Sequence, residues 1–357
     1  MANIHDVAAL AGVSVSSVSN VLNRRTEKMA ADTFARVEAA IRSLNYQPNR
    51  VARQLKTGHT PMLGLLVPST ANPMYGQLAL KIEAAAQALF GYRLLLANTH
   101  RDPGQEAGMF EDLLSFGVRS VIVVSSLDDE GHMEKAVASG LAVVSYDRGV
   151  GPGDDSLVDH VSPDNYQAGY LAAAHLIEHG HRQLAFVVPS GSTISRANKI
   201  AGFRARMAEA GEGFVAQVIE GVPSSGLPYG RFGDSGLADL GAEMATRIAA
   251  LRPRPTGLVA VNDMLAIGLM SGFQAAGLQV PRDVSVVGMD GLAIAAFFNP
   301  GLTSLAMPLD EMAGALVSRA VERSRQATLA PVHLTFQPTL IARQSVAGPA
   351  AAPEEHP

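Results

Sequence analysis

The first sixty residues carry apolar positions at helical spacing. One stripe consists of Ile4, Val7, Ala8 and Ala11, and a second consists of Val18, Val21 and Leu22. Both stripes have the spacing of one apolar helix face. Gly12 lies between them and permits a tight helix stop, and the Ser14 hydroxyl is suited to cap the second helix. The pattern predicts two short amphipathic helices joined by a turn.

The outward face of the second helix is small and polar. Ser16, Ser17 and Asn20 point away from its apolar stripe. Two helices with such a face form a helix-turn-helix, whose second helix fits the DNA major groove and meets base edges with hydroxyl and amide groups. The alternative is an inert helical bundle, and this stretch alone does not decide between the two.

Two basic segments follow the helix-turn-helix pattern. The loop Asn23-Arg24-Arg25-Thr26 is suited to lie beside DNA phosphates, and a third helix is predicted over about residues 31–44. This helix lacks a Ser or Thr cap at Met29-Ala30, and Pro48 ends the pattern. The stretch NRVARQLKTGHT, residues 49–60, is either a solvated linker or a short helix that forms only on DNA.

From Met62 the pattern changes to short runs rich in β-branched residues, alternating with helical segments. The runs are MLGLLVP, YRLLLAN, SVIVVS, AVVSYD, LAFVVP, LVAVND and VSVVGMD. The helical segments are 75–90, 105–116, 132–139, 165–179, 196–210, 237–250 and 264–276. This alternation predicts doubly wound parallel sheets with helices on both faces, and the length favours two such subdomains.

Polar groups follow several of the predicted strands. The strand ends read Pro68-Ser69-Thr70-Ala71-Asn72, Asp147-Arg148, Pro189-Ser190-Gly191, Asn262-Asp263 and Asp290-Gly291. Open parallel sheets bind ligands beyond these ends, and carboxylates and amides there suit a polyhydroxylated molecule. Any single one of these residues is more simply a turn or a helix cap. As a set they favour a binding cleft.

Composition narrows the class of protein. The chain has 357 residues, 47% of them apolar, no cysteine and a net charge of −5. Residues 1–60 hold eight Lys/Arg against four Asp/Glu, while the rest hold 20 against 29. The asymmetry indicates a nucleic-acid module on an acidic domain, unless it is a chance fluctuation in a short segment. We see no signal peptide and no long uncharged apolar run, so we expect a cytoplasmic protein without a membrane span.

Other motifs receive structural interpretations. His175, His179 and His181 invite a metal site, but no HExxH arrangement accompanies them and we favour a structural role. The GxGxxG and GxSxG patterns of dinucleotide sites and hydrolases are absent, so we expect no enzyme activity, cofactor or metal.

An ordered series of motifs resembles the lactose repressor family of transcription regulators over nearly the whole chain. The series comprises NIHDVAALAGVSVSSVSNVLN, LNYQPNRVARQLKTGHT, LGLLVPSTANPMYGQL, LIEHGHRQLAFV, IAGFRARM, VNDMLAIG and VSVVGMDG, then PGLTSLAMPLDEM. The resemblance implies an N-terminal all-α helix-turn-helix domain and a bilobal α/β core like that of periplasmic binding proteins. It also implies a regulator, expected to be a repressor, that a sugar or sugar derivative controls.

The resemblance assigns DNA contacts by position. Val15, Ser16 and Asn20 match the base-reading positions. Leu55 matches the hinge leucine that enters the minor groove, with Lys56 beside it. The expected contacts to the DNA backbone are Ser14, Ser17, Asn23, Arg24, Arg25 and Arg53.

The resemblance also assigns the effector cleft. Its matched positions are Asn72, Tyr75, Asp147, Arg148, Ser195, Asn262, Asp263 and Asp290. Lys199 stands where the family often has an arginine, so the effector class is open.

These assignments give an expected domain plan. It comprises a DNA-binding domain at 1–48, a hinge at 49–61, a core at 62–345 and a disordered tail at 346–357. Within the core, we assign 62–162 with 292–325 to one subdomain and 163–291 with 326–345 to the other.

The expected partners are palindromic operator DNA, a carbohydrate-like small molecule and a second copy of the chain. We expect a dimer because the tail lacks a tetramer-forming leucine heptad. The competing classes are a secreted sugar-binding protein and a doubly wound oxidoreductase.

Overall fold

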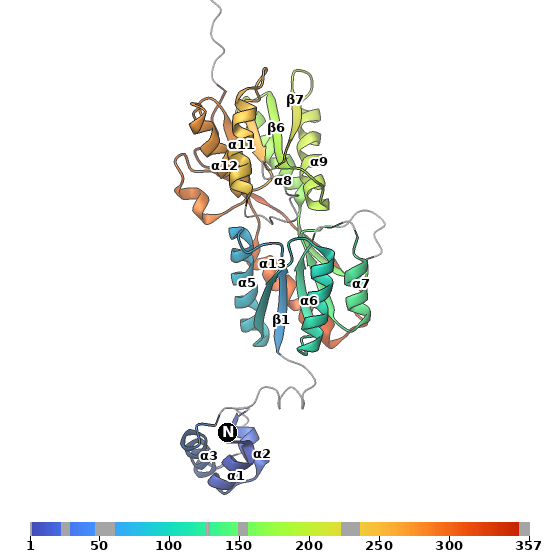
Figure 1. Ribbon diagram of the computed structural model, residues 1–357, viewed down its shortest axis with the longest axis vertical. Helices are drawn as coiled ribbons and strands as arrows, with labels where there is room; N and C mark the ends of the chain where they lie inside the picture. Colours follow the sequence, from blue (N-terminus) through green and yellow to red (C-terminus); the bar gives the residue numbers. More distant parts are fainter. Residues whose placement is uncertain are drawn as a thin grey trace, which may run out of the picture. The chain divides into compact units, whose positions relative to one another are not determined.

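The computed structural model describes residues 2–22, 29–46, 61–125, 127, 129–148, 156–222 and 236–349 (Figure 1). The chain divides into two compact units, residues 1–60 and 61–357. The loop 23–28, the hinge segment and residues from 350 onward lie outside the described residues, as does most of the stretch 221–236. The expected disordered tail at 346–357 begins too early, because the Ala347 N–H donates to Ser285 Oγ at 3.1 Å.

The N-terminal unit contains three helices in its described part. They are α1 (Ile4–Ala11), α2 (Val15–Leu22) and α3 (Ala31–Ser43). Asn3 and Asp6 form a reciprocal capping box at the start of α1, and Gly12 ends that helix with φ 60°, in the left-handed region. The apolar stripes meet in one small core around Val7, Val18 and Val37. The sequence predictions of the two helices, the turn and the third helix are confirmed.

The first sheet of the larger unit is wholly parallel. Its strands are β1 (Met62–Val67), β2 (Arg93–Asn98), β3 (Ser120–Val124), β4 (Ala142–Tyr146), β5 (Asp159–Pro163) and β11 (His333–Phe336), in the order β11-β5-β4-β3-β1-β2. Successive side chains of a strand point to opposite faces. Leu65 therefore packs with α5 (Pro73–Phe90) and α13 (Leu309–Arg325), whereas Leu66 packs with α6 (Pro103–Ser115) and α7 (Gly131–Ala138).

The second sheet repeats this plan. Its strands are β6 (Gln183–Pro189), β7 (Val215–Gly221), β8 (Gly257–Ala260), β9 (Ser285–Asp290), β10 (Thr303–Ala306) and β12 (Thr339–Ile341), in the order β12-β10-β9-β8-β6-β7. Only β12 runs antiparallel to its neighbour among these pairs. The helices of this subdomain are α8 (Asn165–Glu178), α9 (Ile194–Glu209), α11 (Leu237–Ala249) and α12 (Asp263–Ala275), followed by the short 3-10 helix η1 (Ala293–Phe297). Two doubly wound sheets are thus confirmed.

The proposed subdomain boundaries need correction. Strand β10 pairs with β9 in the second sheet, although residues 292–325 were assigned to the first subdomain. Strand β11 pairs with β5 in the first sheet, although residues 326–345 were assigned to the second. The chain therefore passes between the subdomains after β5, after β10 and between β11 and β12. Short strands such as His333–Phe336 carry too few residues to show which sheet they join.

Candidate functional site

Helix α2 of the N-terminal unit presents the predicted DNA-reading side chains. Ser16 and Asn20 are exposed, and Val15 is half-buried. Ser14 accepts a hydrogen bond from the Ser17 backbone N–H at 3.1 Å, and the two hydroxyls lie 3.0 Å apart. The cap therefore fixes the start of α2 and leaves the outward positions open to a ligand.

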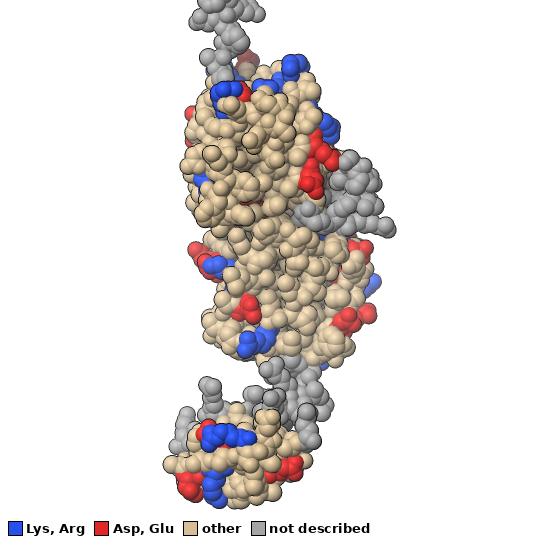
Figure 2. Space-filling model, turned by 60° about the vertical axis from the view of Figure 1, so that its left-hand side comes forward, with Lys and Arg blue, Asp and Glu red and all other residues tan. Residues whose placement is uncertain are grey.

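The basic charge of this unit lies mostly outside the described residues. Arg36 and Arg42 are its two described basic residues; Arg36 donates to the Ala11 carbonyl at 3.2 Å and so ties α3 to α1. The predicted contacts Asn23, Arg24, Arg25, Arg53, Leu55 and Lys56 all lie outside the described residues. Figure 2 shows basic and acidic side chains interspersed over the visible face of the larger unit, without a large patch of one sign.

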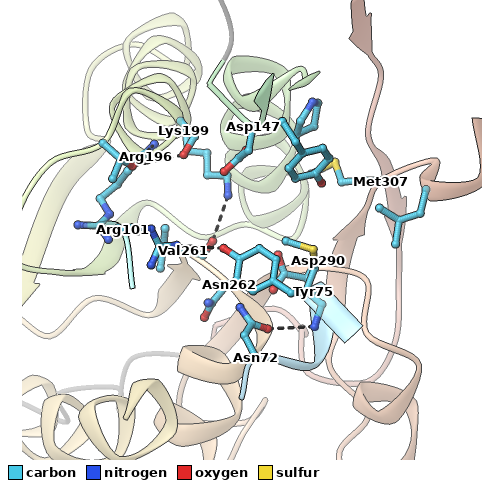
Figure 3. A pocket seen from close by; sticks show the side chains of 16 residues that line it. Asn72, Tyr75, Arg101, Asp147, Arg196, Lys199, Val261, Asn262, Asp290 and Met307 are labelled. Atoms are coloured by element: carbon cyan, nitrogen blue, oxygen red, sulfur yellow. Dashed lines mark hydrogen bonds between the residues drawn. The ribbon is translucent and has the colours of Figure 1, made fainter. Parts of the chain in front are cut away.

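A cleft lies between the two sheets of the larger unit, at the carboxyl ends of their strands. Its free cavity volume is about 60 Å³, and it opens to solvent. Its lining comes from both subdomains (Figure 3): Asn72, Met74, Tyr75, Arg101, Tyr146, Asp147, Pro163, Thr193, Ser195, Arg196, Lys199, Val261, Asn262, Asp290, Met307 and Leu309.

Two amides in the cleft also cap helices. The Asn72 side chain accepts from the Met74 N–H at 3.0 Å, and the Asn262 side chain accepts from the Leu265 N–H at 2.9 Å. Both residues are almost completely buried, at 2% and 8% exposure. Helix capping and cleft lining therefore coincide at these strand ends, because each cap residue lies in the short connection between a strand and the helix that follows it.

Two carboxylates enter the cleft from strained backbone. Asp147 has φ 73° and Asp290 has φ 130°, conformations that residues other than glycine rarely adopt and that concentrate at functional sites. Asn165 donates to Asp147 at 3.1 Å. Burial, and then the charges of Asp147 and Asp290, raise the pKa of the Tyr146 hydroxyl well above its usual value. Tyr146 therefore enters the cleft as a neutral phenol.

Three cationic side chains also line the cleft. Arg101, with φ 55°, donates to the Tyr75 hydroxyl at 3.0 Å. Arg196 donates to the Pro189 carbonyl at 3.0 Å and to the Gly191 carbonyl, so the loop after β6 holds its guanidinium. The Lys199 ammonium lies 3.5 Å from the Val261 carbonyl. Arg196 and Lys199 are three residues apart on α9, which places them on one face of that helix.

The structure brings together most of the predicted cleft residues. Those that line the cleft are Asn72, Tyr75, Asp147, Ser195, Lys199, Asn262 and Asp290.

Two predicted residues are directed elsewhere. The Arg148 Nε atom lies 3.2 Å from Glu130 Oε1 and donates to the Leu127 carbonyl. Asp263 accepts from Ser304 Oγ at 2.5 Å and from the Leu292 N–H at 2.7 Å, with its side chain fully buried. Both side chains are therefore held by partners within the core, and neither lines the cleft.

Sequence reasoning missed Arg101 and Arg196. Arg101 follows β2, whose polar end Asn98-Thr99-His100-Arg101 obeys the same strand-end rule but was not included. Arg196 lies one helical turn before Lys199, a spacing that pointed to it.

His179 and His181 form hydrogen bonds that require no metal, and the His175 ring packs against that of His179. His179 Nδ1 lies 2.7 Å from the His175 carbonyl, and His181 bridges Thr256 and the Ala347 carbonyl at 2.9 and 2.8 Å. Desolvation lowers the pKa values of His175 and His181, which favours their neutral forms. No cluster of potential metal ligands occurs among the described residues, and no described helix has the length and apolarity needed to cross a membrane.

A helix-turn-helix unit attached to a bilobal core with a central cleft defines a class of DNA-binding regulator. Residues 3–49 match the model of the lacI family of bacterial regulatory proteins, and residues 173–346 match a periplasmic binding protein-like domain. The chain is 32% identical to the transcriptional regulator DegA of Bacillus subtilis (strain 168), across 96% of this chain and 97% of DegA. It is 33% identical to the repressor PurR of Serratia proteamaculans (strain 568), across 97% of each chain. The chain therefore belongs to the lacI family of bacterial regulatory proteins.

Solved structures agree with this assignment. A Lac repressor structure bound to ONPG superposes with a TM-score of 0.80 at 25% identity, covering 97% of this chain and 99% of that one. A complex of the regulator CelR with cellobiose superposes with a TM-score of 0.68 at 26% identity, covering 97% and 100%. The sequence relatives are transcriptional regulators rather than enzymes.

Proposed function

We propose that this chain is a repressor-type regulator whose affinity for a palindromic operator is controlled by a small polyhydroxylated molecule bound between its two core subdomains. The observation that carries the proposal is the convergence of Asp147, Asp290, Asn72 and Asn262 from both sheets on one cleft. Carboxylates and amides form paired hydrogen bonds with hydroxyl groups. Similar regulators have been solved with cellobiose and ONPG bound, which supports a carbohydrate-like ligand.

DNA binding in this proposal uses two copies of the chain. One helix-turn-helix reads a half-site, so a homodimer reads a palindrome. Val15, Ser16 and Asn20 contact base edges, while Ser14, Ser17 and the basic residues of the loop and hinge contact the backbone. Leu55 enters the minor groove beside Arg53 and Lys56, partly unstacking one base step.

Ligand control follows from the position of the cleft. A molecule that contacts Asp147 from one subdomain and Lys199 from the other favours one relative orientation of the subdomains, and thereby one spacing of the two hinges. It shifts the equilibrium only by its different affinity for the two states, typically about 1–3 kcal/mol. The ligand acts as inducer or corepressor according to which state it prefers.

The test is a gel-shift titration of the full-length protein on its own upstream DNA, with and without a panel of sugars, polyols and purines. We expect a retarded complex whose affinity one compound changes at least fivefold. Asp147→Ala and Asp290→Ala should abolish that response and keep operator affinity, while Asp112→Ala, on the exposed face of α6, should keep both. Absence of specific DNA binding would reject the proposal, and unchanged responses in the cleft variants would reject this cleft as the ligand site.

A further inference from the structure

The cleft reverses the charge balance of the unit that contains it. Outside residues 1–60 the chain has 29 acidic against 20 basic residues. Among the described residues, the cleft lining nevertheless contains three cations, Arg101, Arg196 and Lys199, against two carboxylates, Asp147 and Asp290. A cleft walled by low-dielectric protein focuses such a local surplus on whatever it holds.

The cations come from both subdomains. Arg101 follows β2 of the first sheet, whereas Arg196 and Lys199 lie on α9 beside the second. Figure 3 shows all three among the residues that line one cavity. An anion between them would therefore contact both subdomains at once, the requirement for a ligand that sets their orientation.

The local geometry prepares these groups for an anion. Carbonyls of the loop after β6 hold the Arg196 guanidinium, and the residue is only 7% exposed. Lys199 is half-buried, and its described polar contact is a weak one to the Val261 carbonyl at 3.5 Å. Burying a cation is costly unless an opposite charge or several hydrogen bonds compensate for it, as the carbonyls do for Arg196. A neutral ligand that closes the cleft over Lys199 would therefore add an unfavourable desolvation term.

The remaining polar groups of the cleft lining are suited to bind hydroxyl groups. Asp147, Asp290 and the neutral Tyr146 phenol offer acceptors and a donor without a positive charge. Asn72 and Asn262 add amide groups at the two strand ends. The cleft thus combines a hydroxyl-binding set with a cationic set, and neither set alone accounts for the lining.

We infer that the effector of this protein is a small polyhydroxylated acid, a sugar that carries one carboxylate or phosphate, held by Arg101 and Lys199 across the cleft. The inference rests on the proposed function, since it names the ligand class of the same site. Guanidinium and ammonium groups form short hydrogen bonds with the anionic oxygens of carboxylate and phosphate, and a neutral sugar offers no anionic acceptor.

The experiment is calorimetric titration of the full-length protein with matched sets of one neutral sugar, its sugar acid and its phosphate, built on the common pentoses and hexoses, together with free purines. In at least one set, we expect an anionic member to bind about tenfold or more tightly than the neutral member. The acid and phosphate arms distinguish the two sources of the negative charge.

Variants localise the effect. Lys199→Gln should reduce the preference for the anionic member at least fivefold, and Lys199→Arg should retain it, which separates charge from folding. The matched control is Lys135→Gln on the exposed face of α7, which should leave the preference unchanged.

Three outcomes would overturn the inference. If a neutral sugar binds as tightly as its acid, or a purine binds in place of both, the ligand class is wrong while small-molecule control stands. If the preference for the anion persists in Lys199→Gln, Lys199 does not hold the anion and the inference fails. If the protein binds operator but no neutral or anionic compound, both the inference and the proposed ligand control fail.

Discussion

The carboxylate of Glu130 and the guanidinium of Arg148 form a buried ion pair, with Glu130 Oε1 3.2 Å from Arg148 Nε and both side chains less than 10% exposed. Arg148 directly follows Asp147, which lines the cleft with its backbone in the left-handed region. Glu130 also accepts from Ser156 Oγ at 2.7 Å and lies 3.4 Å from His160 Nε2. This cluster anchors the residue next to Asp147 and thereby helps to fix the carboxylate in the cleft.

We expect Glu130→Gln to lower the free energy of unfolding by about 3 kcal/mol, because it removes the carboxylate that faces a buried guanidinium. Burial raises the pKa of Glu130, but hydrogen bonds with His160 and Ser156 and the charges of His160 and Arg148 together outweigh it, so the pKa lies below its usual 4.5. The stabilisation from the ionised form is therefore present above pH 4.5 and is lost as the pH falls through the lower, folded-state pKa.

Urea denaturation across the acidic range checks this expectation. The matched control is Glu134→Gln, an exposed acidic residue on α7. A Glu130→Gln variant as stable as the control at neutral pH would show that the ion pair has no net stabilising role.

Helices α8 and α9 cross at two glycines, and this crossing positions Lys199. A Cβ atom on Gly202 would lie 1.8 Å from the Tyr166 carbonyl oxygen, and one on Gly169 would lie 1.8 Å from the Lys199 carbonyl oxygen. We expect Gly202→Ala to separate the helices, to lower the free energy of unfolding by about 2 kcal/mol or more, and to weaken ligand binding.

Gly108→Ala on α6 provides the opposite case. A Cβ atom there meets nothing within 4 Å, so alanine should stabilise the helix by roughly 0.5–1 kcal/mol. Thermal unfolding of both variants, with ligand titration of each, tests the crossing. Equal stabilities of the two variants would mean that α8 and α9 move apart without cost.

For Asp263 we expect a pH dependence of stability opposite in sign to that of Glu130. Desolvation raises its pKa from 3.8 to about 6, although the hydrogen bonds from Ser304 and Leu292 oppose the shift. Because the folded-state pKa is the higher one, the folded protein binds more protons than the unfolded chain between these two pKa values. The free energy of unfolding therefore falls as the pH rises from about 4 to 6. The loss amounts to roughly 2–3 kcal/mol at 1.36 kcal/mol per unit of pKa.

Asp263→Asn removes this titration. The difference in unfolding free energy between the original protein and the variant should therefore shrink as the pH rises from 4 to 6.5. Urea midpoints at several pH values measure it. A difference that stays constant with pH would show that Asp263 does not titrate in this range.

Variants at Asn20 and Ser14 test base contact and helix capping in turn. Asn20 is exposed on α2, so Asn20→Ala should leave the melting temperature unchanged while lowering operator affinity by about 1–3 kcal/mol, the usual worth of a good base contact. Ser14 caps α2 and is a proposed contact to the DNA backbone. Ser14→Ala should therefore lower the stability of the N-terminal unit by about 1 kcal/mol and weaken binding to operator and unrelated DNA alike. Fluorescence anisotropy on operator and unrelated DNA distinguishes the two. Unchanged operator affinity in Asn20→Ala would remove Asn20 from the reading surface.

The sequence by itself determined the features that depend on near neighbours along the chain. The helix-turn-helix needs only apolar residues at helical spacing, Gly12 with its left-handed backbone and the Ser14 cap. The alternation of strands and helices, and the polar residues at strand ends such as Asn72 and Asn262, follow from the same local patterns. Since those ends meet at one edge of each sheet, the position of the cleft was also predictable.

Only the tertiary structure decided where long side chains point and which sheet a short strand joins. Arg148 and Asp263 stand at strand ends like the cleft residues, but each finds a partner remote in sequence, Glu130 and Ser304. The strand-end rule and the helical spacing to Lys199 indicate the positions of Arg101 and Arg196, but only the folded chain shows that their side chains line the cleft. The sheet that β10 or β11 joins also depends on pairing with strands distant in sequence. Four residues are enough to predict a strand but not to predict which strand it pairs with.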